Sequence, residues 1–183
     1  VGGSTHDGEE RLLAQMFPRL KEHCPGLMLV LVPRHFERAR VVGEQLRALG
    51  QRFVFRSELT DESGADCLVV DSTGELMLFY EAASVVFVGK SLTAHGGQNP
   101  IEPASLGRAI VFGPEMQNFR AVVRSFLVED AATQVVDAAG LEIAVAELLK
   151  DPEKRNAQGT RARAVVEANK GATQRTAQMT ARV

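Results

Sequence analysis

Residues 85–103 decide the fold, and they read Val85-Val86-Phe87-Val88-Gly89-Lys90-Ser91-Leu92-Thr93-Ala94-His95-Gly96-Gly97-Gln98-Asn99-Pro100-Ile101-Glu102-Pro103. The apolar run 85–88 is typical of a strand that is buried on both faces. A loop with paired glycines follows, and a helix is then predicted, because Asn99 is a favourable N-cap and Pro100 suits the first helical position. A strand, a loop and a helix start in this order form the repeating unit of an α/β fold.

The same segment predicts an anion site. Gly96 and Gly97 would let a ligand approach the backbone closely, and free N–H groups at the helix start attract phosphate or carboxylate. Glu102, beside that site, can accept hydrogen bonds from ribose hydroxyls. The Asn99–Glu102 spacing also fits an ordinary capping box, which remains an alternative. The two preceding glycines favour a ligand site, and we interpret the motif as part of a nucleotide-sugar site.

Strand-like and helix-like segments alternate outward from this region. Val1 is expected to end a first strand and residues 2–6 to form a loop. Further strands are predicted at 27–32, 52–55, 67–70, 85–88, 109–112 and 133–136. Helices are predicted at 7–23, 37–49, 74–83, 99–106, 117–127 and 141–149. The alternation indicates a Rossmann-like parallel sheet with helices on both faces, whose ligands bind beyond the carboxyl ends of the strands.

Composition narrows the function classes. A chain of 183 residues fits one α/β domain, and we expect residues 151–183 to form a helical segment that packs outside the sheet. The formal net charge of −2 argues against general nucleic-acid binding. There is no signal peptide and no apolar run of about 20 residues, the length that spans a bilayer. The chain opens on Val1 without an initiator Met, so we interpret it as a soluble fragment of a longer protein.

Other loops at the same sheet edge supply candidate residues. Pro33 and Arg34 follow the most hydrophobic strand, where a guanidinium can bind phosphate; an exposed pair with Glu37 is the alternative. Gly74-Glu75-Leu76 begins a helix whose backbone could contact a nucleobase. Ser4, Thr5 and Glu9 surround another helix start and suit an anionic group and sugar hydroxyls, or simple N-capping. No metal-ligand spacing, Walker loop or nucleophile elbow is present.

Taken in order, these motifs resemble the C-terminal half of the bacterial 3-deoxy-D-manno-octulosonic acid (Kdo) transferases. The resemblance covers residues 2 to about 175. It rests on Gly3-Ser4-Thr5-His6-Asp7-Gly8-Glu9-Glu10, 32–38, 70–76, Phe79-Tyr80, Ala82-Ala83, 87–92, 96–104, 112–114 and 169–173. One departure is Lys90, which stands where a second glycine is expected after Gly89.

The resemblance implies half of a GT-B glycosyltransferase, which binds CMP-Kdo and transfers Kdo to a lipid A precursor with inversion, in lipopolysaccharide biosynthesis. It places the nucleotide on Pro33, Arg34, Gly74, Glu75, Leu76, Asn99, Pro100, Ile101 and Glu102. It places the sugar and phosphate loop at Ser4, Thr5, Glu9, Gly96 and Gly97. It implies no metal or other cofactor, and a catalytic base on an N-terminal domain that this chain lacks.

By the same resemblance, the full-length enzyme would associate with the cytoplasmic face of the bacterial inner membrane. The acceptor would bind mainly the missing domain, so the fragment alone is expected to be inactive. Two alternatives remain open at this point. One is another GT-B nucleotide-sugar enzyme, such as a UDP-sugar transferase or a 2-epimerase-like protein. The other is a non-catalytic flavodoxin-like binding module.

Overall fold

The computed structural model describes residues 1–60 and 64–180, with side chains through residue 170. Seven parallel strands in this part of the chain form one sheet in the order β3-β4-β2-β1-β5-β6-β7. The strands are β1 (Gly2–Thr5), β2 (Leu29–Pro33), β3 (Phe53–Phe55), β4 (Cys67–Val69), β5 (Val85–Val88), β6 (Ala109–Phe112) and β7 (Thr133–Gln134). The helices are α1 (Glu9–His23), α2 (Ala39–Ala48), α3 (Leu76–Ala82), α4 (Ile101–Ser105), α5 (Arg120–Val128), α6 (Ala138–Lys150) and α7 (Pro152–Thr180).

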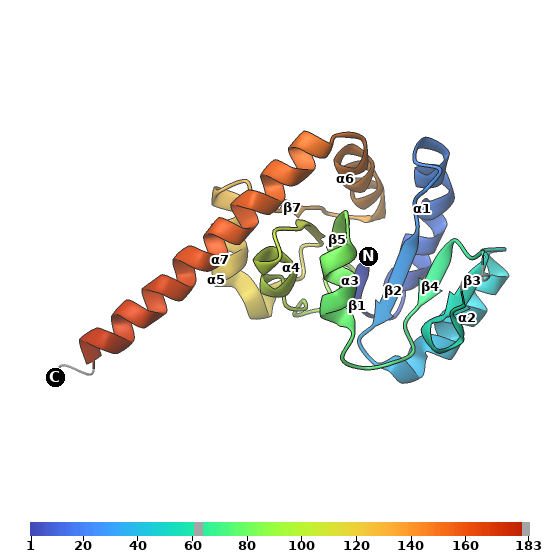
Figure 1. The fold of residues 1–183 in the computed structure, drawn as a ribbon, viewed down its shortest axis with the longest axis horizontal. Coiled ribbons are helices and arrows are strands. Elements are labelled where there is room, and N and C mark those ends of the chain that lie inside the picture. Colours follow the sequence, from blue (N-terminus) through green and yellow to red (C-terminus); the bar gives the residue numbers. More distant parts are fainter. Residues whose placement is uncertain (61–63, 181–183) are drawn as a thin grey trace.

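Helices cover both faces of the sheet, as Figure 1 shows. On one face α1, α2 and α6 contribute apolar side chains to a core cluster with the central strands. On the other face a second cluster joins residues from α3, α4, α5 and α7 to β5 and β6. Three short 3₁₀ segments, Phe36–Arg38, Arg56–Glu58 and Gln117–Phe119, precede α2, follow β3 and precede α5. The expected parallel sheet with helices on both faces is therefore confirmed.

Strands β5 and β6 occur at the predicted residues because each is a continuous apolar run, fully buried between the two helix layers. The expectation for the first strand was wrong. Gly2–Thr5 forms β1, paired in parallel with β2 on one side and β5 on the other. A glycine is required inside this strand, since a Cβ on Gly3 would lie 2.1 Å from the Tyr80 hydroxyl oxygen. Close packing, rather than a turn, explains the glycines here.

Helices α1 to α5 each begin two or three residues later than predicted, and two of these starts concern the candidate site. Helix α4 starts at Ile101, with Pro100 as the flanking residue, so Asn99 lies one position further out than expected. The Asn99 side chain still caps the helix, because its Oδ1 accepts the Ile101 N–H at 3.0 Å. Helix α3 starts at Leu76 rather than at residue 74, because Gly74 adopts φ +85°, outside the helical region.

Helix α7 packs beside α4 and β6, and it buries Ala162, Val165 and Val166 in the second core cluster. Figure 1 shows the second half of this helix extending beyond the rest of the fold. Residues 181–183 of the expected C-terminal segment lie outside the described residues. No helix among residues 1–60 and 64–180 combines the length and apolar character that crossing a bilayer requires.

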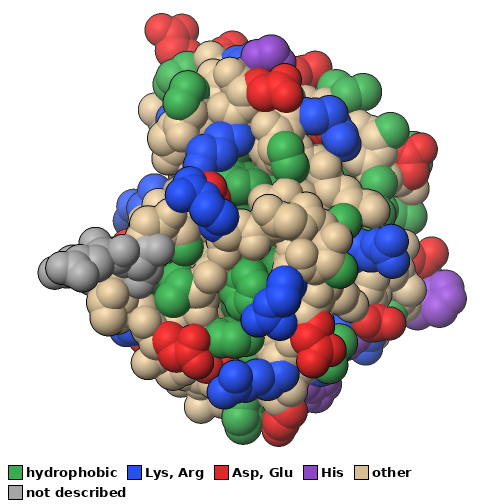
Figure 2. Space-filling view, turned by 90° about the vertical axis from the view of Figure 1, so that its right-hand side faces the viewer, with side chains coloured by type: hydrophobic (Ala, Val, Ile, Leu, Met, Phe, Trp, Pro, Cys, Tyr) green, Lys and Arg blue, Asp and Glu red, His purple; other side chains and the backbone are tan. Residues whose placement is uncertain are grey.

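The β3 edge of the sheet faces the viewer in Figure 2, where acidic and basic side chains are interspersed around an apolar hollow. The guanidinium groups of Arg40 and Arg47 lie over the rings of Phe55 and Phe53, with 5.0 and 5.6 Å between Cζ and the ring centroid. These contacts cover aromatic surface at the sheet edge with the planar faces of arginines.

We predict that Gly89→Ala destabilises the fold. A Cβ at this position would lie 2.3 Å from the backbone carbonyl oxygen of Ser4, which cannot move without breaking the alignment of β1 and β5. Urea unfolding should show a loss of about 3 kcal/mol in the free energy of unfolding. Gly26→Ala is the matched control, since its Cβ would meet nothing within 4 Å. Equal stability of the two variants would contradict this packing account.

Candidate functional site

The candidate site lies at the carboxyl edge of the sheet, where β1 and β5 meet. From β1 the chain continues to β2 and β4 on one side, and from β5 it continues to β6 and β7 on the other. The strand order therefore reverses between β1 and β5, which is where parallel α/β sheets bind ligands.

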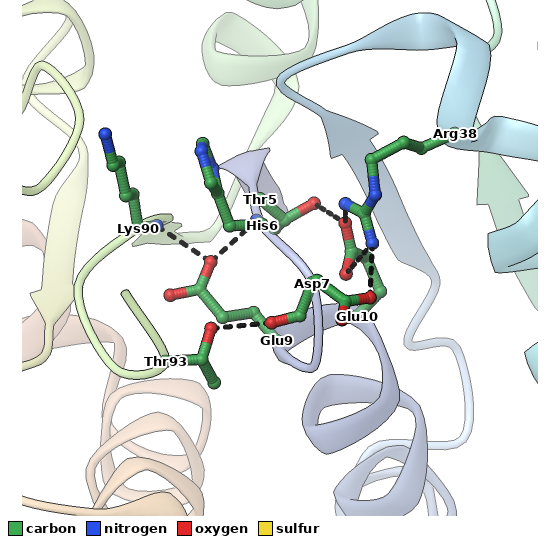
Figure 3. A network of polar contacts seen from close by, with 8 residues as sticks. All are labelled: Thr5, His6, Asp7, Glu9, Glu10, Arg38, Lys90 and Thr93. Carbon is green, nitrogen blue, oxygen red and sulfur yellow. Dashed lines mark hydrogen bonds and ion pairs between the residues drawn. The ribbon is translucent and has the colours of Figure 1, made fainter. Parts of the chain in front are cut away.

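The buried carboxylate of Glu9 joins the two strand tips (Figure 3). Glu9 is 1% exposed, at the start of α1. Its Oε1 accepts the backbone N–H groups of Ser91 and Leu92 at 2.9 and 3.1 Å. Its Oε2 accepts those of His6 and Lys90 at 2.9 and 2.8 Å. Four N–H donors satisfy both oxygens of this carboxylate and hold the β5 loop against the loop that follows β1.

A second buried carboxylate, Glu10, organises the side of the site toward α2. It accepts the Thr5 hydroxyl at 2.9 Å and Arg38 Nη1 at 2.7 Å. Arg38 also donates to Asp7 at 2.9 Å, as Figure 3 shows. Burial acts to lower the pKa of Arg38, but the hydrogen bond and charge of Glu10 outweigh it, and the pKa lies above its ordinary value. The pair Glu10–Arg38 is thus charged and internally balanced.

Backbone strain is concentrated at the two strand tips. Ser4 and Lys90 adopt φ values of +51° and +57°, in the left-handed region that side chains with a Cβ disfavour. Gly89 packs against Ser4 between them, and its N–H donates to the Gly3 carbonyl at 2.9 Å. Such strain persists only where surrounding contacts enforce it, and it is often found at functional sites.

The turn before α3 is anchored by two carboxylates and left open at its tip. Asp71 accepts the N–H and hydroxyl of Ser57 at 3.0 and 2.6 Å. Glu75 is held by the Ser72 hydroxyl and by Arg56, whose Nη2 lies 3.0 Å from Oε1. The Ser72 hydrogen bond chiefly lowers the pKa of Glu75; burial opposes this, and the charge of Arg56 adds to it. A Cβ added at Gly74 would meet nothing within 4 Å, so the tip of this anchored turn is open.

Asn99 and Glu102 contact each other at the start of α4. Asn99 Nδ2 donates to Glu102 Oε1 at 3.0 Å, while Oε2 has no partner among the described residues. Burial, and then the charge of Glu102, raise the pKa of the Tyr80 phenol. The Tyr80 hydroxyl packs against Gly3 of β1, so Tyr80 links this corner to the strand tip.

Gly96 and Gly97 serve packing rather than offering their N–H groups. The Gly96 N–H donates to Gln117 Oε1 at 2.8 Å, and the Gly97 N–H to the Lys90 carbonyl at 3.0 Å. A Cβ on Gly97 would lie 2.4 Å from the sulfur of Met116. Both glycines have positive φ, so they allow the long loop to fold under the β6 loop.

Pro33 is the last residue of β2 and is buried, whereas Arg34 is exposed just beyond it. The Arg34 N–H donates to the Thr5 carbonyl at 2.9 Å. Its guanidinium forms no hydrogen bond or ion pair with another side chain in the part of the chain that the structure describes. Arg34 therefore presents a free cation at the sheet edge, and the alternative of a pair with Glu37 is not observed.

The expected site residues thus form four groups at one edge of the sheet. They are the strand-tip group Ser4, Thr5 and Glu9, the β2 end with Pro33 and Arg34, the turn Gly74–Leu76, and the α4 start with the preceding Gly96 and Gly97. Glu9 and Thr5 are directed inward to hydrogen-bond partners, so we interpret them as positioning residues. The sequence reasoning did not pair Glu10 with Arg38, and it assigned Tyr80 no role in the site. The partners Glu10 and Arg38 are 28 positions apart, and no local spacing marks them. No cluster of metal-ligating side chains occurs within residues 1–60 and 64–170.

We predict that Glu9→Gln lowers stability. The backbone N–H groups of His6, Lys90, Ser91 and Leu92 surround the carboxylate and form a buried nest, the Glu9 nest. The amide replaces one acceptor oxygen by an NH₂ group, which would face two of these N–H donors. The free energy of unfolding should fall by about 2–3 kcal/mol. Glu44→Gln, at an exposed position on α2, is the matched control and should change little. An unchanged midpoint for Glu9→Gln would contradict the role assigned to this carboxylate.

We further predict that Ser72→Ala raises the pKa of Glu75 toward its ordinary value, measured by NMR titration of its side-chain resonances. A lowered folded-state pKa stabilises the fold above the unfolded-state pKa, and this contribution disappears as the pH falls through the folded-state pKa. The variant should therefore lose less stability on acidification. Thr73→Ala, at the neighbouring exposed position, should leave the Glu75 titration unchanged. Identical titrations in both variants would refute the Ser72 contact.

Comparison with known proteins supplies the family. No protein-family model matches the chain. It is 37% identical over 178 residues to a 3-deoxy-D-manno-octulosonic acid transferase of Haemophilus influenzae, and 35% identical over 178 residues to one of Bordetella pertussis. These matches cover 96% and 94% of this chain but 42% of each relative, so the chain spans less than half their length.

Among solved structures, the chain is 31% identical to the C-terminal CMP-Kdo binding domain of WaaA from Acinetobacter baumannii, with a TM-score of 0.84. The match covers 90% of this chain and 86% of that one. An α,α-trehalose 6-phosphate synthase of Burkholderia multivorans, 15% identical with a TM-score of 0.60 over 92% of this chain, shares the fold alone. The expected architecture, one half of a GT-B glycosyltransferase, is confirmed, and the chain belongs to the 3-deoxy-D-manno-octulosonic acid transferase family, to whose C-terminal domain it corresponds.

Proposed function

We propose that this chain is the donor-binding domain of a glycosyltransferase that transfers Kdo from CMP-Kdo to a lipid A precursor. The observation that carries the proposal is the match, at 31% identity over 86% of its length, to a solved CMP-Kdo binding domain. The arrangement of free polar groups at the β1/β5 edge supports it. Residues 1–183 form a single such domain in this proposal, and the rest of the enzyme lies outside them.

The nucleotide occupies the corner between α3 and α4. Glu102 Oε2, which has no partner among the described residues, accepts ribose hydroxyls, while Asn99 orients the carboxylate through the other oxygen. The open turn at Gly74, anchored through Glu75, contacts the base with Leu76 beneath it. Pro100 and Ile101 lie at the start of α4, at the border of this corner.

The phosphate lies closer to the strand tips. The free guanidinium of Arg34, just beyond buried Pro33, meets its charge, since a planar fork suits phosphate oxygens. Ser4 lies at the end of β1, beside the sugar. Thr5, Glu9, Gly96 and Gly97 hold the surrounding loops in place through the contacts described above and do not bind the ligand themselves.

In the reaction, an acceptor hydroxyl oxygen attacks the anomeric carbon of Kdo and forms the new glycosidic bond. The bond from that carbon to the phosphate oxygen breaks with inversion, and CMP leaves with the bonding electrons. The hydroxyl proton passes to a carboxylate base on the N-terminal domain. This domain stabilises the charge that develops on the phosphate through the guanidinium of Arg34, so the proposal requires no metal.

The acceptor, the base and the association with the cytoplasmic face of the inner membrane belong to the full-length enzyme in this proposal. The chain spans 42% of the H. influenzae and B. pertussis transferases. It should accordingly bind donor nucleotide but transfer no sugar alone. Closure of two domains over a substrate commonly completes such a site.

We predict that Arg34→Gln and Glu102→Gln each weaken CMP binding roughly tenfold, measured by isothermal titration calorimetry, because each removes a charged partner of the nucleotide. Arg124→Gln, which removes an exposed guanidinium on α5, is the matched control and should bind CMP like the parent chain. UDP should bind more weakly than CMP.

Equal affinity of the Arg34, Glu102 and Arg124 variants would contradict the assigned site. Tighter binding of UDP than of CMP would favour a UDP-sugar enzyme of the same fold instead. An absence of nucleotide binding at millimolar concentration would favour a non-catalytic module.

A further inference from the structure

Two polar side chains at the strand tips have no role in the site described so far. Lys90 is half-buried, and its ammonium has no partner among the described residues. Its backbone adopts φ +57°, a conformation that costs free energy for any residue with a Cβ. A glycine would avoid that cost, so a lysine here requires an explanation from its side chain.

His6 is the second such residue. Its Nδ1 atom is buried and has no hydrogen-bond partner among the described residues. Buried polar atoms in folded proteins are nearly always hydrogen-bonded, so an orphaned one indicates a missing partner. The ring centroid of His35 lies 6.2 Å from that of His6, at an edge-on angle of 63°, and it supplies no hydrogen bond.

The backbone holds Lys90 and His6 side by side. Their N–H groups both donate to one atom, Glu9 Oε2, at 2.8 and 2.9 Å. Figure 3 shows both side chains leaving on the same side, away from the Glu9 carboxylate. The two residues come from different strand tips, so the Glu9 nest also fixes the spacing of their side chains.

The polar groups around this pair leave room for an anion. Four N–H donors occupy both oxygens of Glu9, and Arg38 pairs with Glu10 and Asp7. None of these three carboxylates forms an ion pair with the Lys90 ammonium. An ammonium and an imidazole N–H that lie side by side can both donate to a carboxylate or phosphate oxygen.

We propose that Lys90 and His6 form an anion-binding pair that takes the carboxylate of the donor's sugar acid. This inference rests on the proposed function and deepens it. In that function CMP-Kdo carries two negative groups, the phosphate and the Kdo carboxylate. Arg34 is assigned to the first, and the β1/β5 tips lie beyond the nucleotide corner, where the sugar extends. Lys90 then adds a contact to the acidic sugar that the glycine expected at this position could not supply.

The test compares two ligands by isothermal titration calorimetry, CMP and CMP-Kdo, on the complete chain. Lys90→Gln keeps the side-chain length and removes the charge, and His6→Phe keeps a ring and removes both nitrogens. Each should weaken CMP-Kdo roughly tenfold and change CMP affinity less than twofold. Lys150→Gln, in the last turn of α6 at the opposite edge of the sheet, controls for the loss of a cation.

Lys90→Gly is a second variant at the same position. It relieves the left-handed backbone, so it should fold at least as stably as the parent while showing the same selective loss of CMP-Kdo affinity. Unchanged CMP-Kdo affinity in the Lys90 variants would overturn the proposal. A parallel loss for CMP and CMP-Kdo would also overturn it, because it places the pair on the phosphate. If the parent chain binds CMP normally in either case, the proposed function stands; if it binds neither ligand, both proposals fail.

Discussion

The hydrogen bonds between the Glu9 carboxylate and four backbone N–H groups are the interaction on which the site depends. Burying a carboxylate is costly unless its oxygens are satisfied, and here each oxygen accepts two donors. Because the donors belong to the loops after β1 and β5, the charge joins two segments that are about 80 positions apart. One of these donors, Lys90, adopts a left-handed backbone conformation that residues with a Cβ disfavour, as does Ser4 at the other strand tip.

This arrangement separates support from binding. On the α1 and α2 side, Glu9, Glu10 and Arg38 are fully engaged with one another and with the backbone, so they fix geometry. On the α3 and α4 side, Glu102 Oε2 has no partner among the described residues, and the turn at Gly74 is open. Rigid support behind free donors and acceptors is the condition under which electrostatic stabilisation of a leaving group is effective. The proposed transfer of Kdo, in which CMP is the leaving group, is a reaction that needs such support.

Much of the fold follows from periodicity, but the strand tips do not. Continuous apolar runs identified β5 and β6 to the residue, since strands buried on both faces leave little alternative. Strand β1 was missed because Gly2-Gly3-Ser4-Thr5 has the composition of a turn. The close approach of Leu13 to Gly2 and of Tyr80 to Gly3 explains its glycines. The α4 motif placed Asn99 and Glu102 next to each other at a helix start, and the structure shows them in contact. The Gly96 and Gly97 N–H groups, however, donate to Gln117 and to the Lys90 carbonyl rather than facing a ligand. Partners such as Glu10 and Arg38 depend on tertiary packing, which no local spacing encodes.

A crystal structure of the chain with CMP tests the account most directly. The account predicts the ribose hydroxyls within hydrogen-bond distance of Glu102, the phosphate beside Arg34, and the phosphate's free oxygen directed toward the tips of β1 and β5. The Glu9 nest should be unchanged by the ligand. A nucleotide bound at another edge of the sheet, or one whose ribose lies away from Glu102, would contradict the account.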